Sequence, residues 1–440
     1  MDWMQLLTRL QTLNPALARH LQEWQGVTIA GYSDAIWQPF SKSFQQQPSN
    51  DTLLDIEQIA SVQAEMDTGI AEQLRLNPVV LTVHHTAPIF HPIALQTLLL
   101  AMAGNHPPKC LPVLATDWVP MDNMFHPRGI LLPEKDKLVT YHLFSKKTRK
   151  QLVSHTNPFD AAMVRNLIDD LNKSSRSGAV SENTKRRGVD FLETFYLDSR
   201  VLGQTSYRRQ CSLVNQLAWQ KLFPKTALHY INVSDFFLPL LKKSITDQSS
   251  IIYKILFDTE FRAAVLDVLD GVGGCWDSRN NSGTLFFWQQ KSGKMYPLLK
   301  LEHNCLSNPN AEFELQPQVL YNALQEGDLL PGLFLVFVQL MFVEGLACIG
   351  GMRQIGYNQT IREGLLRVCE ERAPEFVEQI QGFPVERFAA GINVLNVTRK
   401  CPATLFDVLE HGELLQTNWR SENFRDAVLG ASDYLLALSG

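Results

Sequence analysis

The chain has 440 residues, which is long enough to bury at least one large core and to fold as two or three lobes. Hydrophobic residues make up 45% of it and charged residues 19%, a balance that excludes a globally disordered or fibrous protein. The net charge of −5 provides no overall basic field for a phosphate backbone, so we expect no nucleic-acid partner.

The cysteines and the first residues indicate a cytoplasmic protein. Seven cysteines are present without a CxxC pair, and an odd number without a framework is typical of reduced thiols. The opening sequence MDWMQLLTRLQTL predicts an amphipathic helix and contains no secretory apolar region.

The first part of the chain predicts an α/β fold. Residues 1–76 form a helical N-terminal segment in this prediction, and residues 77–170 form the first part of a Rossmann-like core. Strands at 79–83 and 110–115 flank a helix from about 92 to 103, an order typical of a parallel sheet. We therefore expect a Rossmann-like parallel sheet core with additional helical and small antiparallel elements.

The later part of the chain divides into three segments in this prediction. Residues 171–188 are rich in Ser, Lys and Arg without apolar periodicity, which indicates a mobile loop or linker. Residues 189–360 complete the core, and the segment 361–440 is helical. Within the core, runs at 284–289 and 295–301 predict a β-hairpin. Further strands are expected at 137–144 and 227–233.

A long apolar run from Leu329 to Gly351 predicts a buried core helix. It includes Pro331, Gln339 and Glu344 and lacks flanking clusters of basic residues. This composition argues against a membrane span, and we expect no membrane partner. A buried Glu344 needs a hydrogen-bonding partner, because an unpaired interior carboxylate is costly.

Polar residues follow the first two predicted strands. Five of the eleven histidines lie between positions 84 and 126. The carboxyl ends of parallel strands share one sheet edge, where ligands usually bind. We expect His84 or His85 to move protons and Asp117 to act as a base or to orient a histidine.

Other polar residues are candidates for holding a substrate. They are His91, Asp122 and Asn123, with Arg128 as a clamp for a carboxylate or phosphate. A third cluster after the apolar run adds the donors Arg353, Gln354 and Tyr357 beside Gly350-Gly351. This cluster contains neither the P-loop motif GxxxxGK[ST] nor the dinucleotide-binding motif GxGxxG.

Plainer interpretations remain open for the same residues. Two or three histidines with Asp117 or Asp122 could hold a divalent metal, but their spacing matches no metal signature, so no metal ligand is assigned. Alternatively the histidines are structural, Asp117 caps a turn, and Asp122-Asn123 forms an Asx turn. No GxSxG elbow or Cys/His signature supports covalent catalysis.

The order of these motifs resembles a known family. Thr82-Val83-His84-His85 is followed by Phe90-His91-Pro92 and a helix, and Leu111–Ala115 is followed by Thr116-Asp117. This order is similar to the cysteine-adding enzymes of bacillithiol synthesis, in which a TGQQP-type loop precedes a helix and a second strand ends in an acidic loop. Further similarities to the family's C-terminal run are Gln316-Pro317, Leu330-Pro331, and Gly350-Gly351 with Tyr357. In this sequence histidines stand where the family has its glutamine pair, and Arg353-Gln354 stands where the family has an acidic residue. No sustained heptad repeat is present.

The resemblance implies a Rossmann-like core and a ligase-like enzyme that joins or modifies an amine or amino acid. It is compatible with a homodimer, and it leaves a nucleotide or a divalent metal open as cofactor. One alternative is a metal-dependent hydrolase or oxygenase that uses His84, His85 and His91. Another is a non-catalytic ligand-binding or scaffold protein.

Overall fold

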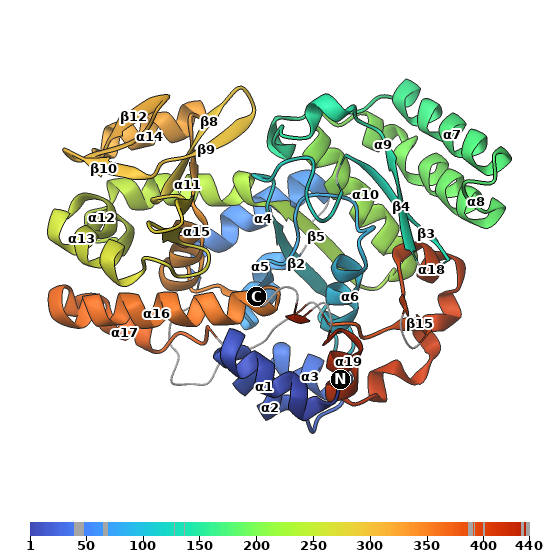
Figure 1. The fold of residues 1–440 in the computed structure, drawn as a ribbon, viewed down its shortest axis with the longest axis horizontal. Coiled ribbons are helices and arrows are strands. Elements are labelled where there is room, and N and C mark those ends of the chain that lie inside the picture. Colours follow the sequence, from blue (N-terminus) through green and yellow to red (C-terminus); the bar gives the residue numbers. More distant parts are fainter. Residues whose placement is uncertain are drawn as a thin grey trace.

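A four-stranded, all-parallel sheet lies at the centre of the protein (Figure 1). The computed structural model describes residues 1–38, 48–64, 69–126, 128–135, 137–385, 390, 392–398, 401–432 and 435–436. The strand order is β14-β1-β2-β5, with bounds Ala347–Ile349, Val79–Leu81, Cys110–Ala115 and Ala227–Asn232. The predicted Rossmann-like α/β core is therefore confirmed.

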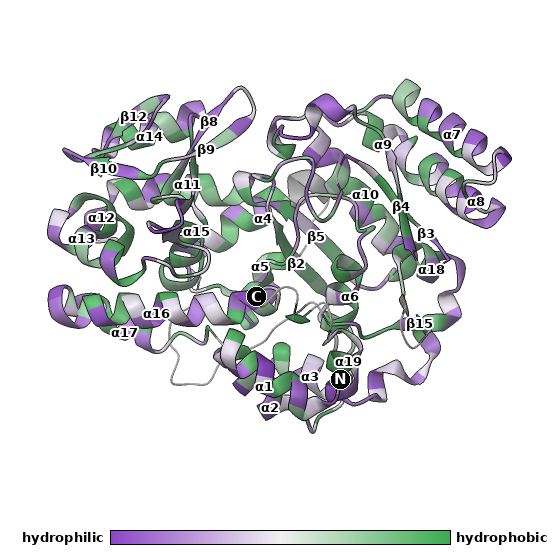
Figure 2. Cartoon of the chain, viewed as in Figure 1, coloured by the Kyte–Doolittle hydropathy of each residue, from purple (hydrophilic) through white to green (hydrophobic). Residues whose placement is uncertain are grey.

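The sheet strands are short and almost entirely buried. Every residue of β1, β2 and β14 is buried, as expected for a parallel sheet covered on both faces. Strand β2 pairs with β5 from Cys110 to Ala115, and β1 pairs with both β14 and β2. Helix α6 (Pro92–Ala101), which connects β1 to β2, is also wholly buried, and Pro92 occupies its first turn. These elements form the apolar centre in Figure 2.

The described residues of the N-terminal segment, which was expected to be helical, contain five helices. Their bounds are α1 Trp3–Leu13, α2 Pro15–Trp24, α3 Ile29–Ile36, α4 Asn50–Ala64 and α5 Ile70–Leu76. Asp2 begins α1 with a capping box, and Asn14 caps α2. The predicted boundary at 76/77 thus falls between α5 and β1.

The segment 171–188 is mostly helical, so the predicted mobile loop was wrong. Helix α7 runs from Ala161 to Arg176 and α8 from Glu182 to Phe191, with Ser181 capping α8. Helix α7 buries Val164, Leu167 and Leu171 and exposes its charged face, as Figure 2 shows. The boundaries proposed at 170/171, 188/189 and 360/361 fall inside α7, α8 and α16.

The other elements between β2 and β5 are a pair of antiparallel strands and several helical segments. Strands β3 (Gly129–Glu134) and β4 (Lys137–His142) form an antiparallel pair. The helical elements are η1 Lys146–Thr148, η2 Val153–His155, η3 Leu192–Tyr196, α9 Ser199–Leu202 and α10 Tyr207–Leu222.

Antiparallel strands follow a second group of helices. The helices are α11 Val233–Thr246, α12 Ile251–Phe257 and α13 Thr259–Val268, and α14 (Pro317–Glu326) comes later. The strands are β6 Trp276–Asp277, β7 Ser282–Gly283, β8 Phe287–Lys291, β9 Lys294–Pro297, β10 Lys300–Glu302, β11 Cys305–Asn308 and β12 Ala311–Glu314. The predicted hairpin is confirmed as β8-β9, with different bounds. Strand β13 pairs with β8 on the other side.

The apolar run from Leu329 to Gly351 is not one helix, and that prediction was wrong. It contains strand β13 (Leu329–Pro331), α15 (Leu333–Phe337), the π-helical turn η4 (Val338–Val343) and strand β14. Gly345 has a φ of +68°, which allows the chain to turn out of η4 into β14. Glu344 does have partners: it accepts hydrogen bonds from Thr52 Oγ1 at 2.5 Å and Gln339 Nε2 at 2.7 Å.

The C-terminal segment is helical only in part. Helix α16 (Met352–Arg372) begins directly after β14 and packs on α2. The later elements are η5 Pro374–Phe376, α17 Val377–Gln381, β15 Asn396–Thr398, β16 Cys401–Pro402, α18 Leu405–Glu410, η6 Gly412–Gln416, η7 Asn418–Ser421 and α19 Phe424–Gly430. Arg187 pairs with Asp407 at 3.0 Å and so ties α8 to α18. Among the described helices, none has the length and apolarity needed to cross a membrane.

Candidate functional site

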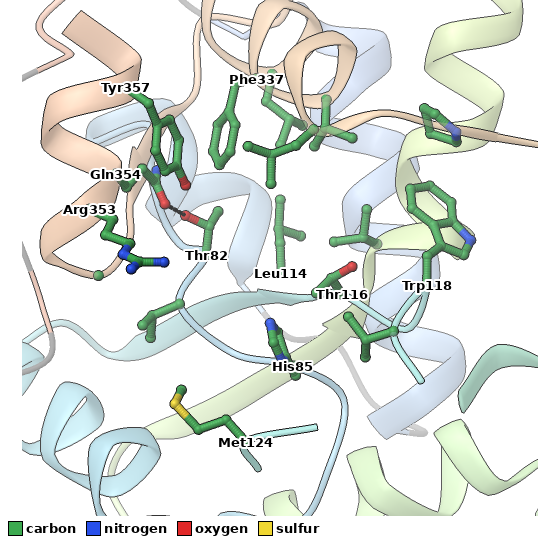
Figure 3. A pocket seen from close by; sticks show the side chains of 18 of the residues that line it. Thr82, His85, Leu114, Thr116, Trp118, Met124, Phe337, Arg353, Gln354 and Tyr357 are labelled. Atoms are coloured by element: carbon green, nitrogen blue, oxygen red, sulfur yellow. Dashed lines mark hydrogen bonds between the residues drawn. The ribbon is translucent and has the colours of Figure 1, made fainter. Parts of the chain in front are cut away.

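A cavity of about 590 Å³ opens at the carboxyl edge of the parallel sheet (Figure 3). The residues after all four strands line it: Thr82, Val83 and His85 after β1, Thr116, Trp118 and Val119 after β2, Val233 after β5, and Gly351, Met352, Arg353, Gln354 and Tyr357 after β14. This is the position at which open α/β sheets usually bind ligands. The structure therefore brings together one part of each predicted polar cluster.

The facing wall of the cavity is apolar and comes from the antiparallel strands β8, β9 and β13 and the helical segments α15 and η4. It consists of Trp288 on β8, Met295 on β9, Leu330 and Pro331 on β13, and Leu333, Val336, Phe337 and Leu340 on α15 and η4. This wall was not predicted from the sequence. The aromatic and branched residues of these segments were visible as strand or helix signals, but nothing in their spacing indicated a ligand.

The segment after β1 stays extended, and this separates the two adjacent histidines. Thr116 N donates to His84 O at 3.0 Å, Thr86 N donates to Thr116 O at 2.8 Å, and His85 forms a parallel bridge with Thr116. Successive side chains of an extended segment point to opposite sides. His85 therefore lines the cavity, while His84 points into the core.

His85 lines the cavity and contacts Asn123, and this contact bears on the tautomer of its ring. Its Nδ1 lies 3.4 Å from Asn123 Oδ1. The Asn123 amide is held in this orientation because its Oδ1 accepts from Phe125 N at 2.9 Å and its Nδ2 donates to Pro120 O at 2.5 Å. This assigns the proton to Nδ1 and the lone pair to Nε2. Burial lowers the pKa of His85, an effect that the Asn123 contact partly offsets, so the ring is neutral at pH 7.

His84 has a structural environment. It is fully buried, packs edge-on against Tyr230 at 5.5 Å between ring centroids, and lies 6.5 Å from Phe125. Neither ring nitrogen has a hydrogen-bond partner among the described residues. Burial, and to a lesser degree the neighbouring His85, lowers the pKa of His84 to about 3. Of the two histidines expected to move protons, only His85 reaches the cavity.

The Asp117 carboxylate binds the beginning of helix α11 and does not contact His85. Its buried carboxylate accepts hydrogen bonds from Ser234 N at 3.2 Å and Ser234 Oγ at 2.5 Å. It also pairs with Arg208 at 3.2 Å, and Arg208 pairs in turn with Asp235 at 2.8 Å. Burial raises the pKa of Asp117, and Arg208 and Ser234 oppose that rise. Asn123, not Asp117, contacts His85, so the predicted orienting residue was wrong.

Gln354 and Tyr357 lie at the end of the cavity where α16 begins. Gln354 Oε1 accepts from Thr82 Oγ1 at 3.1 Å, and its Nε2 donates to Cys348 O at 3.0 Å. A Cβ atom on Gly350 would lie 1.5 Å from Gln354 Oε1, so a larger residue there would require the Gln354 side chain to move. Burial raises the pKa of Tyr357, which keeps its hydroxyl protonated. Figure 3 shows Arg353, Gln354 and Tyr357 grouped at this end.

Asn123 and three other residues predicted to bind substrate do not line the cavity. His91 caps α6 by accepting from Ile93 N at 3.3 Å, and burial lowers the pKa of His91 to about 4. Asp122 pairs with Arg149 at 2.7 Å. Arg128 lies 3.9 Å from Asp122 and 3.3 Å from His142, and it lines a separate shallow hollow.

The described residues contain no group of three histidine, cysteine, aspartate or glutamate side chains placed to hold one metal ion. His84, His85 and His91 have the separate environments given above, so they do not form the predicted alternative metal centre.

Sequence comparisons gave no family for this chain: no family profile and no curated protein matches it.

Proposed function

We propose that the cavity is the active site of an enzyme that acts on a small molecule, with His85 as the general base. The observation that carries this proposal is the contact of His85 with Asn123 at the cavity, from which we infer the tautomer of the ring. A neutral imidazole, held by Asn123 through Nδ1, presents the lone pair of Nε2 to a cavity at the carboxyl edge of the sheet. A positioned imidazole of this kind accelerates proton transfer by about 10²–10⁴-fold.

The specific reaction that we propose is ligase-like formation of a carbon–nitrogen bond. An amine attacks an electrophilic carbon, the leaving group departs with its bonding electron pair, and Nε2 of His85 takes the proton from nitrogen. The described lining contains no carboxylate that would hold an ammonium ion, which favours the neutral, nucleophilic form of the amine. The resemblance to the cysteine-adding enzymes of bacillithiol synthesis favours the same reaction class.

A non-catalytic ligand-binding protein is the second candidate, and the composition of the lining favours it. Most of the residues around the cavity are apolar, as in sites that retain a ligand by burial. Turnover distinguishes the two functions, because a binding protein leaves its ligand unchanged.

A turnover assay tests the proposal. The protein is incubated with a mixture of primary amines, amino acids and activated acyl donors, namely acyl phosphates and acyl thioesters, and new amides are followed by mass spectrometry. We expect an amide that accumulates with the wild-type protein and forms at least about 100-fold more slowly with His85→Gln. Equal rates for the two proteins would contradict the role of His85.

His84→Gln serves as the matched control, because it changes the adjacent histidine without entering the cavity. We expect it to lower the melting temperature but to retain turnover below that temperature. If no amide forms with any donor, the ligation is wrong and the binding function gains support.

A further inference from the structure

We infer that the amine substrate enters this cavity as an uncharged aryl amine, with its amino group beside Thr116 and His85. The inference rests on the proposed function, because it takes the cavity as the site of the amine that is joined. It adds the chemical class of that amine and a residue that positions it.

Thr116 lies beside His85 and can hold the same polar group of a ligand. The two residues form a parallel bridge between the segments that follow β1 and β2, and both line the cavity. Bridge partners place their side chains side by side on one face of a sheet. Figure 3 shows Thr116 and His85 in this arrangement, between Tyr357 and Trp118.

The hydroxyl group of Thr116 is available to a ligand. It makes no side-chain hydrogen bond within the described part of the chain, whereas the hydroxyl of Thr82, also in the lining, already donates to Gln354. A primary amine has two N–H groups. One can donate to Nε2 of His85 and the other to Oγ1 of Thr116, so this pair of acceptors matches an amino group.

The charge of the lining favours an uncharged ligand. No aspartate or glutamate is present in the described lining, His85 is neutral, and burial raises the pKa of Tyr357 and keeps its hydroxyl protonated. Arg353 also lines the cavity, but it already interacts with another residue, and we assign no ligand group to it. A charged group that leaves water without a counter-charge is strongly disfavoured. An ammonium ion should therefore bind poorly here.

The remaining lining favours an aromatic ring. Trp288 and Met295 face the sheet edge from β8 and β9, and Trp118 and Phe337 contribute further rings. Aromatic rings and thioether sulfur both pack favourably against a ligand ring. An aryl amine combines such a ring with a nitrogen that is unprotonated at pH 7, because its lone pair is delocalised into the ring. An alkyl amine or an amino acid is an ammonium ion at the same pH.

Ligands that share one ring system and differ in charge test the inference. N-phenyl-1-naphthylamine, an uncharged fluorescent probe, is displaced in turn by 1-naphthylamine, 1-naphthylmethylamine and 1-naphthoate. At pH 7 the first of these three is uncharged, the second is a cation and the third is an anion. We expect 1-naphthylamine to bind the wild-type protein at least about tenfold more tightly than either charged ligand. The difference from the cation should shrink as the pH rises toward the pKa of its amine.

Thr116→Val tests the positioning residue, because it removes the hydroxyl and keeps the shape of the side chain. It should weaken binding of 1-naphthylamine by about two- to tenfold, as loss of one hydrogen bond does. Binding of 1-methylnaphthalene, which has no N–H group, should not change. Thr116→Ser, which keeps the hydroxyl, should restore most of the affinity. The matched control is Thr140→Val on β4, outside the cavity, which should change neither affinity.

Two filled variants locate the ligands in the cavity. Val336→Trp should block the probe and 1-naphthylamine, and Leu333→Trp, at a more exposed lining position, repeats the test if the first variant does not fold. These titrations need no turnover, so their result is independent of the amide assay. Tight binding of 1-naphthylamine without any amide would contradict the ligation but support the ligand class. An amide formed from alkyl amines and not from aryl amines would overturn the inference.

Four results of the titrations would also overturn it. They are no binding of 1-naphthylamine to the wild-type protein, equal or tighter binding of either charged ligand, unchanged binding in both filled variants, and an unchanged affinity for 1-naphthylamine in Thr116→Val.

Discussion

The two walls of the cavity are built on different principles. The wall at the sheet edge is positioned by polar contacts, in which Asp117 holds α11, Asn123 holds His85, and Gln354 joins Thr82 to β14. The wall from β8, β9, β13 and α15 is apolar. This difference indicates a division of labour, in which the first wall aligns reacting groups and the second supplies affinity. Substitutions in the two walls should therefore have separable effects.

The largest expected effect on stability comes from Asp117, at the base of the polar wall. Asp117→Ala leaves Arg208 and the beginning of α11 without their buried carboxylate and should lower the free energy of unfolding by about 3 kcal/mol. Denaturation with urea measures this free energy of unfolding for the wild-type protein and the variant. The matched control is Asp122→Ala, because Asp122 also follows β2 but its pair with Arg149 is exposed, so the loss should stay under about 1 kcal/mol. Similar losses in both variants would contradict the structural role of Asp117.

Substitutions in the apolar wall should change the affinity of the cavity for a ligand. Trp288→Ala removes an indole from the lining and should weaken binding of N-phenyl-1-naphthylamine by about tenfold, through lost burial of apolar surface. Tyr296→Ala is the control, since Tyr296 alternates with the lining residue Met295 on β9 and does not itself line the cavity. If the two variants bind the probe equally, this wall does not supply the affinity.

An effect on stability that does not exceed that of Asp117→Ala is expected at Gly350. The added methyl group of Gly350→Ala would meet the amide of Gln354 and displace it from Thr82 and Cys348, at a cost of about 1–3 kcal/mol in unfolding free energy. Gly412→Ala is the control, because a Cβ there meets no atom within 4 Å. An unchanged unfolding free energy for Gly350→Ala would show that Gln354 is not fixed in this position.

The last prediction concerns acid stability and His84. Its folded-state pKa of about 3 lies below the model-peptide value of 6.5, so below pH 6.5 protons bind the unfolded chain more readily than the folded protein. The stability from this neutral histidine is complete above pH 6.5 and is lost as the pH falls toward 3. For one such group, the free energy of unfolding changes by at most about 1.4 kcal/mol per pH unit.

Urea denaturation of His84→Leu between pH 6.5 and 4 should show a dependence on pH that is shallower by about this slope. The surface residue His106 provides the control in His106→Leu. A wild-type slope in His84→Leu would show that His84 is not held neutral in the core. His91, with a pKa of about 4, should retain part of the acid sensitivity in either variant.

The sequence predicts the sheet more reliably than the site. Strand β2 was expected at its observed bounds, and the polar residues after β1, β2 and β14 do meet at one edge. Strand β14 was missed because a buried strand and a buried helix both appear as a continuous apolar run, and only pairing with β1 distinguishes them. The helices between 171 and 188 were missed because their charged, exposed faces conceal a narrow apolar stripe.

The site residues depend on contacts that are distant in sequence. Periodicity places His84 and His85 on opposite sides of an extended segment, but it does not say which side is the cavity. The partners of Asp117 are 91 and 117 residues away, at Arg208 and Ser234, so no local pattern shows that its carboxylate is already engaged. Trp288 and Met295 line the cavity only because strands β8 and β9 fold against the carboxyl edge of the parallel sheet.

The most direct test of the central claim is the protonation state of His85, measured by ¹⁵N NMR of the histidine rings at pH 7. The signals that disappear in His85→Gln identify the residue. We predict a neutral ring with the proton on Nδ1, and a shift of its Nε2 signal when 1-naphthylamine is added. A charged ring, a proton on Nε2, or a signal that does not respond to the probe would contradict a cavity built around His85 as a base.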